Sequence, residues 1–76
     1  MTSAHLHLSF PRDLISEPVL HRLATAFDLV STIRRANLEE DRGGWMILQV
    51  DGDDEAIARA VAWLGEQGVD VDRIAP

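Results

Sequence analysis

Residues 29–50, LVSTIRRANLEEDRGGWMILQV, carry a pattern that leaves few choices for the fold. A strand is predicted over 45–50, with Met46, Leu48 and Val50 on one side and Trp45, Ile47 and Gln49 on the other. Another strand is predicted over 29–38, and the glycines at 43–44 suit the positive φ angles of a tight turn. The segment therefore predicts a β-hairpin in the middle of the chain.

The first strand of this hairpin does not alternate cleanly. Leu29 and Ile33 fit one side of a strand, whereas Ala36 and Leu38 fit the other. A bulge or bend between Ile33 and Ala36 would bring all four apolar side chains to one side. The adjacent Arg34-Arg35 pair is typical of an edge strand, so we expect an irregular edge strand here.

Strands and helices flank the hairpin in a repeated order. Residues 4–10 alternate as a half-buried strand, and residues 17–27 carry an apolar stripe at helical spacing. A second helix is predicted over 54–67, and a short strand over 69–74. The order βαββαβ holds two right-handed strand–helix–strand crossovers. It predicts an α+β ferredoxin-like plait, with a four-stranded antiparallel sheet in the order 4-1-3-2 and two helices on one face.

The ends of both predicted helices carry typical residues. Ser16 and Asp53 are expected as N-caps, because their side chains can accept hydrogen bonds from free backbone N–H groups. Asp28 tolerates the left-handed conformation that ends a helix, and Gly68 is a natural residue to follow the second helix. These signals set the helix boundaries given above.

The predicted topology gives each central strand a buried side and an open side. The side beneath the helices carries Leu6, Leu8, Phe10, Met46, Leu48 and Val50, which we expect to form the core. A tryptophan and an isoleucine on the uncovered side call for an explanation, because large exposed apolar patches usually mark interfaces. We predict an interface, with itself or with a partner, formed by His5, His7, Trp45 and Ile47. Scattered apolar residues on a monomer remain the alternative.

The charge of the chain excludes several classes of partner. The net charge is −6, with thirteen acidic residues against seven arginines and no lysine. Nucleic acids and anionic membranes need a basic surface, so neither is expected as a partner. The longest apolar run, 60–64, is too short for a membrane span, and we see no signal peptide. We expect a cytoplasmic protein without membrane insertion.

Six short motifs follow one another along the chain. They are Glu17-Pro18-Val19-Leu20, Ile33-Arg34-Arg35-Ala36-Asn37-Leu38, Gly44-Trp45-Met46, Gly52-Asp53, Ala60-Val61-Ala62-Trp63-Leu64 and Gly68-Val69-Asp70-Val71. In this order and spacing they resemble the NIL domain, a ferredoxin-like module related to ACT regulatory domains. NIL domains occur at the C-terminus of bacterial methionine-importer ATPases and in short stand-alone proteins. The resemblance spans 6–74, so we expect 1–76 to be a single stand-alone domain.

The resemblance also implies a function. It implies a homodimer and, as in the importers, feedback binding of methionine close to the dimer interface. Ligand contacts in the family come largely from the second strand. By position, the resemblance therefore implies a ligand site near Ser31, Thr32, Ile33, Arg35 and Asn37.

Three other features suggest chemistry, and each has a plainer alternative. His5 and His7 lie on one strand face as a metal pair would, but His21 is on a helix across the sheet and no third ligand remains. The acidic residues 51–55 lack the spacing of a calcium loop and fit helix capping better. Arg34-Arg35 could bind a ligand carboxylate, with solvated edge charges as the alternative. No metal site and no cofactor are predicted.

No nucleophile–base pair or phosphate-binding loop is present in the sequence, so we predict that the protein is not an enzyme. The first hypothesis is a homodimeric module that senses a small amino acid and regulates a separate transporter or metabolic enzyme. The alternative is a ligand-free interaction domain for a partner in sulfur or amino-acid metabolism.

Overall fold

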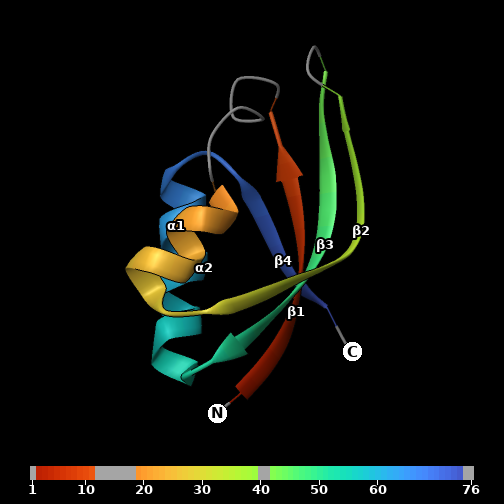
Figure 1. Ribbon diagram of the computed structural model, residues 1–76. Helices are drawn as coiled ribbons and strands as arrows, with labels where there is room; N and C mark the ends of the chain where they lie inside the picture. The colour runs from red at the N-terminus through yellow and green to blue at the C-terminus, as the bar shows by residue number, and fades with distance from the viewer. Residues whose placement is uncertain (1, 12–18, 40–41, 75–76) are drawn as a thin grey trace.

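The computed structural model describes residues 2–11, 19–39 and 42–74. The elements are β1 (Thr2–Phe10), α1 (Val19–Phe27), β2 (Val30–Glu39), β3 (Gly43–Gly52), α2 (Asp54–Glu66) and β4 (Asp70–Ile74). The strands form one antiparallel sheet in the order β2-β3-β1-β4, and both helices lie on the same side of it (Figure 1). This is the predicted order 4-1-3-2 read from the other edge, so the ferredoxin-like α+β fold is confirmed.

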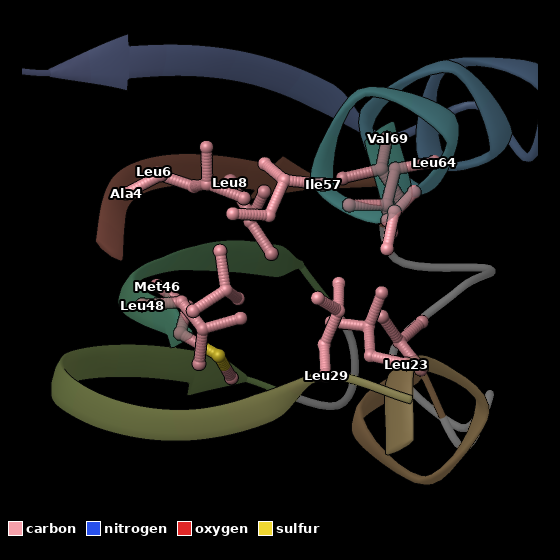
Figure 2. Close-up of a cluster of buried hydrophobic side chains, with 14 of the residues drawn as sticks. Ala4, Leu6, Leu8, Leu23, Leu29, Met46, Leu48, Ile57, Leu64 and Val69 are labelled. Atoms are coloured by element: carbon pink, nitrogen blue, oxygen red, sulfur yellow. The ribbon is translucent and has the colours of Figure 1, made fainter. Parts of the chain in front are cut away.

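The core lies between the sheet and the two helices (Figure 2). The alternation of β1 and β3 sends every second side chain into it, and the six predicted core residues on these strands are all buried. Leu23 of α1 and both Ile57 and Leu64 of α2 close the core from the helix side. No polar or charged side chain of the described residues is fully buried. Hydrophobic burial therefore holds the two layers together.

β2 is the edge strand, as the sequence predicts. Its register against β3 shifts between Ile33 and Arg35, which is the expected bulge, and the strand bends along its length (Figure 1). Every residue of β2 except Ser31 is exposed, including Val30 at 66% and Ile33 at 49%. The edge strand thus contributes little to the core and presents side chains on both faces.

The two glycines of the hairpin have different structural roles. Gly43 takes the positive φ of 85° that the turn requires, as predicted. Gly44 instead lies in β3 opposite Leu38, and a Cβ at this position would be 2.8 Å from the Cα of Leu38. The prediction that Gly44 also takes a positive φ in the turn is therefore wrong, and the missing Cβ of Gly44 instead permits close approach of the β2 backbone.

The helix ends agree with the sequence in part. Asp28 has a φ of 56° and Gly68 a φ of 93°, so both left-handed exits are confirmed. Asp53 precedes α2 in extended conformation, but its side chain makes no capping hydrogen bond, which corrects the expected role. The Ser16 cap lies outside the described residues. Neither α1 nor α2 has the length and apolar character needed to cross a bilayer.

Candidate functional site

We call the side of the sheet that the helices leave uncovered the open face (Figure 1). Its centre consists of the β1 and β3 side chains that alternate with the core residues, namely Ser3, His5, His7, Ser9, Trp45, Ile47, Gln49 and Asp51. All of these except the exposed Ser3 are half-buried. The four residues predicted as an interface therefore lie together on one uncovered surface.

The middle of the open face is both aromatic and apolar. The imidazole of His7 stacks on the indole of Trp45, with ring centroids 5.9 Å apart and an interplanar angle of 17°. Ile47 lies opposite His7 across the β1–β3 pair. Aromatic and aliphatic side chains that remain partly accessible in the middle of a sheet face are typical of the central part of protein interfaces.

β2 extends the open face at one edge of the sheet. Asn37 pairs with Trp45, and Arg35 pairs with Ile47. Cross-strand partners project to the same side of a sheet, so Asn37, Arg35 and the similarly oriented Thr32 lie on the open face. Three of the five predicted ligand residues are therefore direct neighbours of the central open-face residues.

The other two predicted ligand residues face the opposite way. Ser31 pairs with Val50 and Ile33 pairs with Leu48, and both partners are core residues beneath the helices. The resemblance implies ligand contacts from this strand but does not say which face of the strand makes them, so the five predicted residues include both faces. The structure does not bring all five predicted ligand residues together on one face, because they lie on both sides of β2.

The hydroxyl of Ser31 has an unusual environment. Its Oγ is buried and is the only such side-chain nitrogen or oxygen of the described residues without a hydrogen-bond partner. A buried hydroxyl without a partner costs about 1–3 kcal/mol. Among the predicted ligand residues, Ser31 thus has the clearest unused hydrogen-bonding capacity.

One end of the open face holds a small polar network. The carboxylate of Asp51 accepts a hydrogen bond from the Ser3 hydroxyl and another from Gln49 Nε2, the latter at 3.2 Å. These three side chains therefore find hydrogen-bond partners in one another within the chain. Across 2–11, 19–39 and 42–74, no three His, Asp or Glu side chains are grouped so that they could hold a metal ion.

The opposite edge of the open face is acidic, which the sequence reasoning missed. Asp72 pairs with His7 and Asp70 pairs with Ser9, so both exposed carboxylates of β4 project onto the open face. The alternation of Val69-Asp70-Val71-Asp72 was the available signal, since Val69 is buried and Val71 packs against the core. The open face therefore carries one cation, Arg35, and one anion, Glu39, at its β2 edge, and two carboxylates at its β4 edge.

Comparison with a solved structure agrees with this fold. The chain is similar to the C-terminal domain of an ABC transporter ATP-binding protein from Enterococcus faecalis. The TM-score is 0.85 at 17% sequence identity, and the alignment covers 95% of this chain and 83% of that one. A likeness at this identity supports the fold alone. No curated protein matches the sequence.

The family itself is shown by the sequence. The family model described as the NIL domain matches residues 4–73, which include both helices, β2 and β3, and most of β1 and β4. The match confirms the resemblance drawn from the six motifs, and the edge strand and open face described above are features of the matched region. The chain therefore belongs to the NIL domain family.

Proposed function

We propose that this protein is a non-catalytic regulatory module that binds a small amino acid and acts as a homodimer. One observation carries the proposal: Arg35 and Asn37, candidate ligand residues, are register partners of Ile47 and Trp45, candidate interface residues. A ligand held against β2 would touch the surface on which a second copy rests. Ligand binding and dimer contacts would then be coupled in free energy.

Membership of the NIL domain family supports a regulatory role rather than catalysis. The similar structure is a domain of an ABC transporter ATP-binding protein, so a transporter is a reasonable target. In this proposal the domain works in the cytoplasm and acts on a separate transporter or metabolic enzyme. No cofactor takes part.

The side chains of β2 suit an amino acid. The guanidinium of Arg35 matches a carboxylate through two parallel hydrogen bonds. The hydroxyl of Thr32 and the amide of Asn37 offer both donors and acceptors beside it. On the other side of the strand, Ser31 offers its unpartnered hydroxyl next to the exposed apolar surface of Ile33. The three open-face groups, Arg35, Thr32 and Asn37, suit the carboxylate and amino groups of an amino acid such as methionine.

Thermal unfolding in the presence of each of the twenty amino acids, and of sulfur metabolites, tests the proposal. A ligand at one hundred times its Kd adds about 2.7 kcal/mol of stability. For a domain of this size the shift in Tm is about 10–20 °C. We expect one class of amino acid to produce such a shift. The absence of a shift with all of them would contradict the sensing function.

Matched variants locate the site. Arg35→Ala and Asn37→Ala should reduce the ligand-induced shift in Tm, because each removes a donor from the open face. Arg59→Ala, on the exposed side of α2, removes the same charge at a distance from β2 and should leave the shift unchanged. Equal responses of all three variants would place the ligand elsewhere.

A ligand-free interaction domain is the second candidate. The half-buried Trp45 and Ile47 favour it, because an apolar open face suits a protein partner whether or not a ligand binds. This function predicts self-association or partner binding without any amino-acid effect on Tm. The ligand screen and a measurement of molecular mass therefore separate the two candidates.

A further inference from the structure

We infer that two copies stack open face to open face about a two-fold axis that runs parallel to the strands between β1 and β3. Arg35 of each chain then lies opposite Asp72 of the other. The inference rests on the homodimer of the proposed function and specifies its geometry. It follows from the arrangement of charges on the open face.

One row of register partners crosses the whole sheet. It runs from Arg35 on β2 through Ile47 and His7 to Asp72 on β4. Neighbouring strands are about 4.8 Å apart, so the backbones of the two charged residues are about 14 Å apart. Both side chains are exposed. Within one chain the cation and the anion are therefore separated by an aromatic and apolar centre.

In a two-fold symmetric dimer, this separation allows the charges of one copy to lie opposite the contrary charges of the other. In a two-fold interface, if one residue contacts a second residue of the partner, the second contacts the first in return. Rotation about an axis parallel to the strands exchanges β2 with β4 and β3 with β1. The same row then places Arg35 over the partner's Asp72, twice, with Ile47 over the partner's His7 between them. Stacked sheets lie about 10 Å apart, which a long Arg and a short Asp side chain together can span.

The next row repeats the complementarity. Asn37, Trp45, Ser9 and Asp70 are successive register partners across the sheet. The same rotation brings the amide of Asn37 opposite the carboxylate of the partner's Asp70, as donor and acceptor. Arg35 carries five N–H donors, so it can bind Asp72 of the partner and still offer donors to a ligand.

Other symmetric arrangements lose this pairing. An axis parallel to the sheet but perpendicular to the strands places β2 over β2 and β4 over β4, so Arg35 never meets Asp72. When this axis passes through the row of Arg35 and Asp72, Arg35 meets Arg35 and Asp72 meets Asp72. Like charges placed opposite one another disfavour an interface. Side-by-side joining of two β2 edges leaves Trp45 and Ile47 uncovered. The charges thus favour the stacked arrangement with its axis along the strands.

Charge-reversal variants test the geometry by native mass spectrometry. Arg35→Glu alone should place two acids opposite each other, and Asp72→Arg alone should place two arginines opposite each other. Each variant should dimerise at least about fivefold more weakly than the wild type. An equimolar mixture of the two should recover the heterodimer, because every facing pair then has opposite charges. The double variant R35E/D72R should recover its own dimer.

Each outcome has a distinct meaning. A wild type with the mass of one chain ends the homodimer of the proposed function. A dimeric wild type whose single variants dimerise equally well, or whose mixed variants do not recover, overturns the geometry alone. Preferential pairing of Arg35→Glu with wild-type chains would instead support the arrangement with β2 over β2.

Two controls keep the test specific. Arg34→Glu makes the same charge change at the register shift, where Arg34 has no assigned partner on β3. Glu66→Arg makes an acid-to-base change on α2, away from the open face. Both should dimerise like the wild type. Recovery of the dimer in the mixture also shows that the single variants are folded.

Discussion

His7 and Trp45 stack on the open face although they are not register partners. His7 lies opposite Ile47, and Trp45 lies opposite Ser9, so the two rings meet diagonally across β1 and β3 with centroids 5.9 Å apart. Diagonal neighbours on a sheet are within reach of aromatic side chains. The stack holds the largest side chain of the open face in one orientation. A preordered side chain loses less entropy when an interface forms.

We predict that Trp45→Glu abolishes dimerisation and leaves the fold intact. The substitution places a charge in the centre of the open face, where it would be desolvated in the dimer. In the monomer the site is only half-buried, so the charge stays hydrated. Light scattering should give a mass near 8.4 kDa in place of twice that value.

Ala62→Glu is the matched control for this prediction. Ala62 is exposed on α2, so the variant gains the same charge on the opposite side of the molecule. It should keep the wild-type mass, and circular dichroism should give folded spectra for both variants. A Trp45→Glu protein with the wild-type dimer mass would show that the open face is not the interface.

Much of the fold follows from the sequence because polar and apolar residues alternate without interruption along β1. Leu6, Leu8 and Phe10 are separated by single polar residues, so a one-residue error in register would expose all of them. The topology then follows from two crossover units of fixed hand. The orientation of each side chain on a central strand is predictable, because the residues that do not face the core must face the other side of the sheet.

The candidate site was less predictable because it lies on edge strands. β2 is exposed on both sides, so burial does not indicate which side each residue faces, and the shift after Ile33 reverses the alternation. The unpartnered hydroxyl of Ser31 depends on its surroundings in three dimensions and has no signal in the sequence. Likewise, the placement of Arg35 and Asp72 at the two ends of one row across the sheet can be recognised only when the strand order and the register are both known.

Leu48→Ala should destabilise the fold by about 2–5 kcal/mol, because Leu48 is completely buried on a central strand. A domain of this length has a total stability of only about 4–11 kcal/mol. Urea unfolding should therefore show a large fall in the midpoint. Ile33→Ala is the control, since Ile33 is 49% exposed and its loss should cost less than about 1 kcal/mol. Equal costs would mean that β2 is covered in the folded protein.

Two glycine substitutions should have opposite effects on stability. In Gly44→Ala the new methyl would overlap the backbone of Asn37 and Leu38, so we expect a loss of about 1–3 kcal/mol and faster amide exchange along β2. Gly65 has no atom within 4 Å of a Cβ position, so Gly65→Ala should add about 0.5–1 kcal/mol. Denaturant titrations measure both. A neutral Gly44→Ala would show that β2 approaches β3 less closely at this point.

Ser31→Ala should leave the free energy of unfolding unchanged or raise it by about 1 kcal/mol, because it removes a buried hydroxyl that has no partner among the described residues. The same variant should reduce the ligand-induced shift in Tm if this hydroxyl binds the amino acid. Ser9→Ala, on a half-buried serine of the open face, is the control for the loss of a hydroxyl as such. If Ser31→Ala lowers the stability by more than about 1 kcal/mol, the hydroxyl is already bonded within the folded chain and is not available to a ligand.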